Sequence, residues 1–170
     1  MASFKERLLS NTNNNAVLSA IVFEHVHGSD ATQYDELIAN NKATLLAALA
    51  TAGVRECVVS YEGFGDSGNV VDVRLTSADD APMSALGNID LAVQDSRYVD
   101  GAWTARVRSQ TMPFSDAFSH FAHVAVYRHH PGFENNDGGS GEVYFEVDSM
   151  RVWIEHRDYY TESIYSENEL

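Results

Sequence analysis

The spacing of apolar residues predicts two long helices. From residue 31 to residue 52 apolar side chains recur at intervals of three, four and seven residues, and Gly53 supplies the left-handed position that commonly ends a helix. A second helix is predicted after Pro113 and before His130, where the same spacing relates Phe114, Phe118, Phe121, Ala122 and Ala125. Both helices therefore carry one apolar stripe that must pack against another layer.

Alternating apolar and polar residues predict strands between and after these helices. The runs lie at residues 54–61, 71–75, 89–94, 102–109, 142–148 and 150–156. In the second run, Val71, Val73 and Leu75 are expected to share one buried face. The glycine-rich residues 62–69 between the first two strands are more numerous than a tight hairpin turn needs, so they predict an open loop and a candidate site.

These elements predict one α+β domain at residues 31–170, with helices packed on a mainly antiparallel sheet and a β-hairpin at the C-terminal end. No internal repeat is visible, and no linker separates two cores. Residues 1–30 are predicted to form a helical N-terminal extension, with a polar Asn-rich loop at residues 11–15.

The pattern of the terminal hairpin fixes its register. With Asp148 and Ser149 as a two-residue turn, the apolar residues 143, 145 and 147 share a face with residues 150, 152 and 154, whereas a slip of one residue mixes the two faces. On the other face this register places Glu142 opposite Glu155. Two opposed carboxylates cost about 0.2 to 1 kcal/mol unless they share a cation or a proton.

Two interpretations of this acidic pair are open. Both carboxylates can extend into water at the open end of the hairpin. Alternatively, they belong to a metal site that also includes His156 on the same strand and the acids of the two glycine-rich segments, Asp66 and Asp137. An oxygen-rich set of this kind favours Mg²⁺, Mn²⁺ or Ca²⁺.

The charge of the chain is negative and unevenly distributed. The net charge is −14, from 25 Asp and Glu against 11 Lys and Arg. Residues 131–170 contain ten acids and only Arg151 and Arg157, and so carry −8 of this total. This distribution disfavours direct binding to nucleic acid or to an anionic membrane and favours a basic partner. No apolar segment reaches about 20 residues, and a cytoplasmic protein is expected.

The nucleophilic and metal-ligating residues provide weaker signals. Cys57 is the single cysteine and is expected to be buried and unreactive beside Val58 and Val59. His120 and His123 lie three residues apart on the second helix, and a partly exposed helix face is favoured over a zinc site. His129 and His130 lie at the helix C-terminus, where the partial negative charge favours protonated imidazole.

Tyrosines and acids alternate near the end of the chain, at residues 158–170. This segment is either an added strand or docked tail, or a recognition surface. In the second case, the contact area comes from Tyr159, Tyr160 and Tyr165, and the attraction for a basic partner comes from Glu162, Glu167 and Glu169.

Three segments together resemble a family of small uncharacterised bacterial proteins, some of which are carried on mobile elements. They are Gly63-Phe64-Gly65-Asp66-Ser67-Gly68, the stretch from Pro131-Gly132-Phe133-Glu134 to Gly141-Glu142, and the Tyr/Glu-rich ending. The resemblance covers roughly residues 34–170, and its most specific part is the Asn-Asp-Gly-x-x-Gly-Glu motif at residues 136–142. It implies no activity, but it selects the same two glycine-rich segments.

The leading hypothesis from the sequence is a small acidic interaction protein without catalytic activity or cofactor. Its acidic, Tyr-rich C-terminal region is expected to bind a basic protein or nucleoprotein surface, as a phage- or plasmid-encoded inhibitor of a host defence nucleoprotein would. The alternative is a metal-dependent hydrolase or a metal-stabilised domain that uses the Asp, Glu and His residues at the glycine-rich segments.

Overall fold

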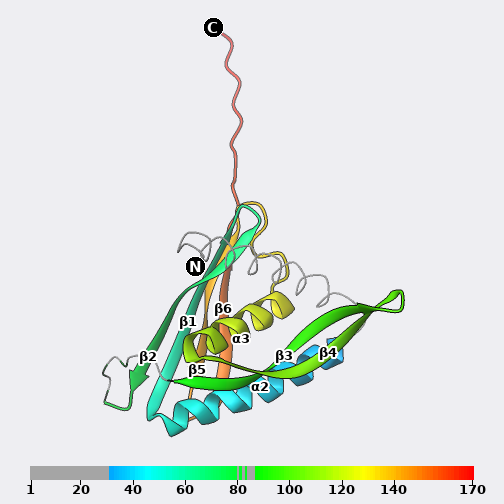
Figure 1. Cartoon of the computed structure of the whole chain (residues 1–170). Coiled ribbons are helices and arrows are strands. Elements are labelled where there is room, and N and C mark those ends of the chain that lie inside the picture. Colours follow the sequence, from blue (N-terminus) through cyan, green and yellow to red (C-terminus); the bar gives the residue numbers. More distant parts are fainter. Residues whose placement is uncertain (1–30, 80, 82, 84–86) are drawn as a thin grey trace, which may run out of the picture.

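The computed structural model describes residues 31–79, 81, 83 and 87–170 (Figure 1). Its elements, in chain order, are α2 (Ala31–Thr51), β1 (Val54–Phe64), β2 (Ser67–Ser77), β3 (Asn88–Val99), β4 (Ala102–Pro113), α3 (Phe114–His129), β5 (Gly139–Glu146) and β6 (Arg151–Asp158). The predicted α+β fold, with two helices on antiparallel sheets and a C-terminal hairpin, is confirmed. The predicted helical extension at residues 1–30 lies outside the described residues.

The strands form two separate antiparallel sheets. Among the described residues, four strands pair in the order β2-β1-β5-β6, and β3 pairs only with β4. The β3–β4 hairpin extends away from the larger sheet, to the right in Figure 1. The terminal hairpin lies at one edge of the four-stranded sheet, with β5 paired to β1 and β6 as the edge strand of the described sheet.

The core lies between the helices and one face of the four-stranded sheet. Leu45 and Leu49 from α2 and Phe118 from α3 are fully buried there. The rings of Phe118 and Phe145 of β5 meet edge to face, with centroids 4.8 Å apart. Cys57 is fully buried in the same core, as predicted, and burial raises the pKa of its thiol. We call the opposite face of this sheet, which carries Glu142 and Glu155, the outer face.

The glycine-rich segment between β1 and β2 is a tight hairpin, not the predicted open loop. β1 continues to Phe64 and β2 starts at Ser67, which leaves only Gly65 and Asp66 as the turn. Both turn residues have positive φ, 58° and 68°, as a two-residue turn matching the strand twist requires. Because a glycine and an aspartate both tolerate this conformation, the strands pair up to the turn.

The predicted burial of Val71 in β2 is wrong. The β1–β2 register shifts between Ser60 and Tyr61, which face Asp72 and Val70 respectively. Val71 is the extra residue of this bulge and is 59% exposed, whereas Leu75 beyond it is buried. A bulge interrupts the two-residue alternation locally, so Val71 leaves the buried face.

The predicted register of the terminal hairpin is confirmed. Val143 faces Ile154, Phe145 faces Val152, and Glu142 faces Glu155. The predicted two-residue turn is wrong, because β5 ends at Glu146 and residues 147–150 form a four-residue turn. Its closing hydrogen bond joins the Met150 N–H to the Val147 carbonyl at 3.1 Å. In the described part of the chain, no helix is long and apolar enough to cross a membrane.

Candidate functional site

The two glycine-rich segments meet at one end of the four-stranded sheet. Gly63 of β1 lies opposite Gly68 of β2 and Gly139 of β5, so three neighbouring strands lack side chains on the core face at this level. The ring of Phe133 fills the space over Gly63 and Gly68, and a Cβ atom on Gly68 would lie 2.5 Å from its Cζ atom. The ring of His156 lies over Gly139. Phe133 thereby fastens the segment at residues 131–138 to the sheet.

Backbone contacts complete this junction. The Asp66 N–H donates to the Glu134 carbonyl at 3.0 Å, so the β1–β2 turn is tied directly to the second glycine-rich segment. Gly138 has φ +78°, and a Cβ atom there would lie 1.9 Å from the Gly63 carbonyl oxygen. No other residue type allows this approach of two backbones.

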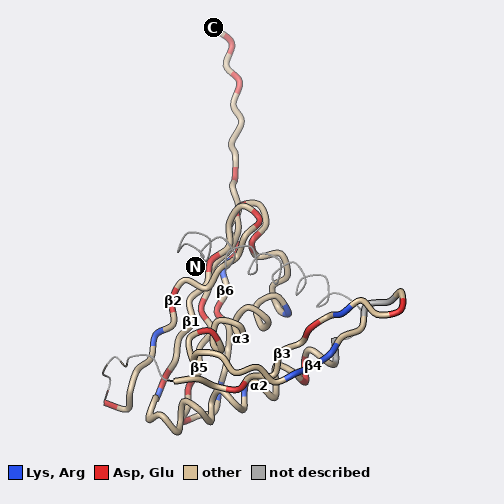
Figure 2. The backbone as a smooth tube through the Cα atoms, viewed as in Figure 1, with Lys and Arg blue, Asp and Glu red and all other residues tan. Residues whose placement is uncertain are grey.

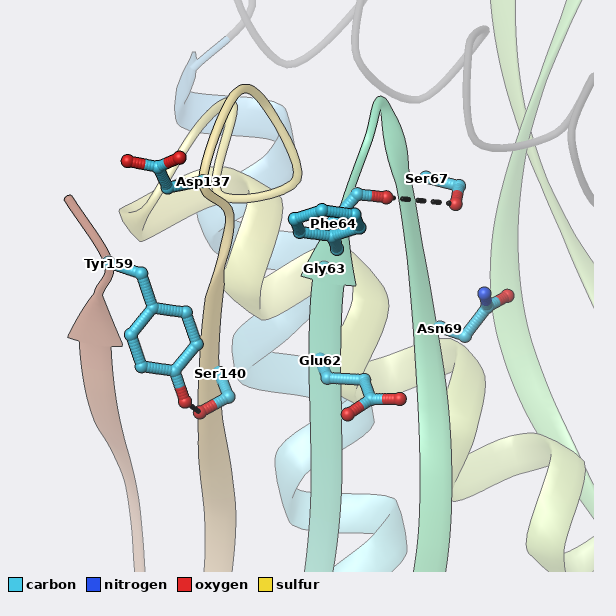
Figure 3. Close-up of a pocket in the computed structure, with 8 residues that line it drawn as sticks. All are labelled: Glu62, Gly63, Phe64, Ser67, Asn69, Asp137, Ser140 and Tyr159. Carbon is cyan, nitrogen blue, oxygen red and sulfur yellow. Dashed lines mark hydrogen bonds between the residues drawn. The ribbon is translucent and has the colours of Figure 1, made fainter. Parts of the chain in front are cut away.

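A hollow of about 320 Å³ lies at the same end of the sheet (Figure 3). It is lined by Glu62, Gly63, Phe64, Ser67, Asn69, Asp137, Ser140 and Tyr159. We call it the tail-root hollow, because Tyr159 is where the C-terminal segment leaves the sheet. The sequence pattern predicted a candidate site at residues 62–69 and selected Asp137 and Tyr159 as individual site residues. It did not predict that these segments share one hollow, because only the pairing of β1 with β2 and β5 brings Glu62, Asn69 and Ser140 side by side.

Glu142 is the centre of a hydrogen-bonded cluster on the outer face. It accepts hydrogen bonds from Arg74 Nη2 at 3.0 Å, from Ser60 Oγ at 3.3 Å, and from the Tyr144 hydroxyl. The Tyr144 hydroxyl contributes most to lowering the pKa of Glu142, and the same bond raises the pKa of Tyr144 to about 12. These donors, which include the guanidinium cation of Arg74, stabilise a charged Glu142.

Glu155, the cross-strand neighbour of Glu142, is exposed and accepts a long hydrogen bond of 3.4 Å from Trp153 Nε1. The rings of Trp153 and Tyr144 stack in parallel at 4.7 Å, and the guanidinium of Arg151 lies 5.0 Å from the Trp153 ring. Stacked aromatic and charged side chains therefore cover the outer face of the terminal hairpin. Glu142 and Glu155 interact with neighbouring donors rather than with each other.

His156 lies on the opposite face from Glu142 and Glu155. Its Nδ1 atom is 2.7 Å from the Tyr61 hydroxyl, and its Nε2 atom is 3.0 Å from Asp158 Oδ1. The His156 ring also stacks on His130 at a centroid distance of 4.1 Å. Both ring nitrogens therefore have protein partners. With the proton on Nε2, His156 donates to Asp158 and accepts from Tyr61, which locks the end of β6 to β1.

The five predicted metal ligands are distributed over separate places. Asp66 is exposed in the β1–β2 turn, Asp137 lines the tail-root hollow, and Glu142 and Glu155 lie on the outer face. His156 lies on the core-facing side of the sheet, where it contacts Tyr61 and His130. Among the described residues, no group of three or more His, Cys, Asp or Glu side chains is placed to hold a metal ion. The metal hypothesis stays a prediction, and the geometry of these residues does not favour it.

The last twelve residues form neither a helix nor a strand. They extend away from the sheet (Figure 1), so the predicted docked tail is not formed. Tyr159 attaches this segment to the described part of the sheet: its N–H donates to the Gly138 carbonyl at 2.9 Å, and its hydroxyl shares a hydrogen bond of 2.5 Å with Ser140 Oγ. Beyond it, Tyr160, Ile164 and Tyr165 are 84%, 93% and 83% exposed. We call residues 160–170 the tail.

The histidines of α3 differ in part from expectation. The side chains of His120 and His123 are half-buried, and in the described part of the structure neither Nε2 atom has a hydrogen-bond partner. Burial lowers the pKa of His123 to about 4, and the neighbouring His120 adds to this effect. His130 is beyond the helix end, as predicted, but burial and His156 lower its pKa, which is opposite to the direction expected from the helix terminus alone.

His123 is expected to make the fold less stable in mild acid. Its pKa is depressed in the folded state, so the unfolded chain binds more protons between about pH 6.5 and pH 4, and stability falls as the pH falls through this window. The loss at pH 4 is expected to reach about 1 to 3 kcal/mol. Urea unfolding of the wild type and of His123→Gln at pH 7 and pH 4.5 measures it. A loss of equal size in both proteins would contradict this assignment.

Comparison with known protein families gave one match. Residues 37–170, which include both glycine-rich segments and the tail, match a family of unknown function, DUF6878. The chain belongs to the DUF6878 family. Residues 1–36 lie outside the match, so the DUF6878 region begins within α2. Searches of curated proteins and of solved structures returned no match. The match confirms that the chain belongs to a family of unknown function, and it provides no activity. The motifs and the mobile-element origin of the resemblance stay predictions.

Proposed function

We propose that this DUF6878 protein is a small, non-enzymatic interaction protein whose tail binds a basic protein surface. One observation carries the proposal: an exposed, extended segment that combines acids with large apolar side chains is fixed at its root by Tyr159. Tyr160, Ile164 and Tyr165 have no packing role in the folded domain, since each is more than 80% exposed. They are available as contact area for a partner.

The charge of the tail supports a basic partner. Glu162, Glu167 and Glu169 lie in this segment, and no Lys or Arg follows Arg157. In the described residues, none of these three carboxylates is in an ion pair, although Glu167 accepts a hydrogen bond of 3.0 Å from Tyr165. Figure 2 shows basic positions on the β3–β4 hairpin, whereas the tail carries only acids among the charged residues. The tail is thus free to attract an external cation.

An extended segment matches this kind of recognition. A tail that becomes ordered on binding loses conformational entropy, so its affinity must come from a few strong contacts. Tyrosine supplies a large contact area with only two rotatable side-chain angles, and carboxylates supply long-range attraction and charge-assisted hydrogen bonds. The combination favours a partner with exposed arginine or lysine residues.

In its more specific form, the proposal is an inhibitor that covers the nucleic-acid site of a nucleoprotein. Such a site is a row of arginine and lysine side chains arranged for phosphates. Carboxylates along the tail can replace phosphates as acceptors for these side chains. Encoding by a phage or a plasmid belongs to this form of the proposal.

Neutralising the tail is expected to weaken binding of a hexa-arginine peptide. The triple variant Glu162→Gln, Glu167→Gln and Glu169→Gln should lower the affinity roughly tenfold, from a few tenths to 1 kcal/mol per exposed pair. The salt dependence of binding should also decrease. Isothermal titration calorimetry at 50 and 200 mM salt measures both.

A matched control removes three exposed acids elsewhere, with Glu36→Gln, Asp79→Asn and Asp116→Asn. This control has the same net charge as the tail variant, so it separates a local effect from a general one. Affinity should change less than about twofold in the control, because exposed charges beyond a Debye length are largely screened. Equal losses in the two variants would contradict the proposal.

A further inference from the structure

We infer that the tail-root hollow binds the guanidinium group of an arginine side chain of the basic partner. The inference rests on the proposed function and adds a specific anchor to it. The hollow lies directly at the base of the tail, since Tyr159 both lines it and begins the extended segment. A partner bound along the tail therefore passes this place.

The lining is complementary to a cation. Its two charged residues are Glu62 and Asp137, and no Lys, Arg or His is among the lining residues. Figure 3 shows the Glu62 carboxylate below Phe64 and the Asp137 carboxylate at the rim, turned away from Glu62. Within the described part of the chain, neither carboxylate is in an ion pair. Arg157 of β6 lies opposite Ser140, and its charge contributes to lowering the pKa of Glu142. Both carboxylates of the hollow are therefore free to pair with an external group.

The neutral groups of the hollow suit a planar, hydrogen-bonding cation. Figure 3 shows Phe64 above Glu62, with Tyr159 and Ser140 on one side and Asn69 on the other. Phe64 is 73% exposed and Tyr159 is 52% exposed, so both rings offer accessible surface. A guanidinium can stack on an aromatic ring while its five N–H groups donate to oxygen acceptors in its plane.

The other occupants fit less well. Anions such as phosphate are repelled by two unpaired carboxylates. A metal ion would need a group of three or more close ligands, and none occurs in the described residues. The volume of about 320 Å³ is at the lower limit for ligand sites, so the hollow accepts one side chain rather than a large molecule.

The position of the hollow also gives a thermodynamic reason for its use. An arginine held there brings the neighbouring basic residues of the partner to a high effective concentration next to the tail. The hollow is built on paired strands, whereas the tail has no secondary structure. An anchor on the sheet and an exposed acidic segment thus act on the same partner.

The test is a ligand-observed NMR titration of the full chain with acetyl-arginine-amide. Acetyl-citrulline-amide, which has the same shape without the charge, is the reference ligand. Wild-type protein should bind the arginine probe and bind the citrulline probe at least about tenfold more weakly. The variant Glu62→Gln with Asp137→Asn should lose about tenfold in affinity for the arginine probe.

The control variant, Glu56→Gln with Asp66→Asn, also removes two acids: Glu56 lies on the same strand and Asp66 in the adjacent turn, but neither lines the hollow. Its affinity for acetyl-arginine-amide should stay within about twofold of wild type. Thermal denaturation checks that each variant is folded, and the single variant Glu62→Gln replaces the double variant if the latter is not.

The outcomes distinguish failure of the arginine site from failure of the proposed tail function. Equal binding of the two probes, or no loss in the Glu62 and Asp137 variant, overturns the arginine site. The tail variant, with Glu162, Glu167 and Glu169 neutralised, should still bind acetyl-arginine-amide. The tail variant can bind acetyl-arginine-amide normally and also bind hexa-arginine as tightly as wild type. In that case the proposed function of the tail fails, while the hollow remains a cation site.

Discussion

Replacing Gly141 with alanine is expected to destabilise the protein by about 3 kcal/mol or more. A Cβ atom at this position would lie 2.1 Å from the Glu155 carbonyl oxygen of β6 and 2.4 Å from the Tyr61 hydroxyl. Neither atom can move easily, because the carbonyl belongs to the backbone of a paired strand and Tyr61 is only 4% exposed. The hydroxyl is also held by His156 at 2.7 Å.

Thermal denaturation measures this effect. A loss of about 3 kcal/mol corresponds to roughly 10 °C in Tm for a domain of this size. Gly87→Ala is the matched control, since a Cβ atom there has no neighbour within 4 Å and its φ is not positive. Gly87→Ala should change Tm by less than about 2 °C. If Gly141→Ala and Gly87→Ala have the same Tm, the close packing of Tyr61 against β5 does not stabilise the terminal hairpin.

Removing residues 160–170 is expected to weaken binding to hexa-arginine strongly while the fold remains intact. The tail has no secondary structure, and its exposed side chains add no buried area to the core. Truncation after Tyr159 preserves the hydrogen bonds of Tyr159 to Gly138 and Ser140. The Tm should therefore change by less than about 2 °C, whereas the affinity for hexa-arginine should fall by at least about tenfold.

An intermediate truncation serves as the control for this prediction. A chain that ends at Ser166 keeps Glu162, Tyr160 and Tyr165 but loses Glu167 and Glu169. Its affinity should lie between those of the full and the shorter chain, because the tail contributes through separate contacts. Undiminished binding by the chain ending at Tyr159 would assign recognition to the folded domain instead.

The sequence predicted the terminal hairpin better than the hairpin at the other edge of the sheet. Val143, Phe145, Val152 and Ile154 share a face only in one register, and burial of that face enforces it. Between β1 and β2, three glycines were interpreted as an open loop. Two of them, Gly63 and Gly68, are instead strand residues whose missing side chains make room for Phe133. That requirement comes from a residue about 70 positions away and is invisible in the local pattern.

The candidate site was predicted only in part, for a related reason. Residues 62–69, Asp137 and Tyr159 were selected from the sequence, but only the pairing of three strands brings Glu62 and Asn69 beside Ser140 in one hollow. The proposed grouping of Glu155 with His156 conflicts with the two-residue period of a strand, which places neighbours on opposite faces. The exposure of the tail could not be derived either, since its composition is compatible with a docked strand.

The central claim is that the tail contacts a basic partner, and NMR mapping tests it most directly. The ¹⁵N-labelled full chain would be titrated with hexa-arginine at 50 mM salt, and the backbone amide shifts followed for every assigned residue. We expect the largest changes at residues 160–170, with smaller changes at Tyr159 and Ser140 beside the tail root. An unchanged tail, with shifts confined to the folded domain, would contradict the claim.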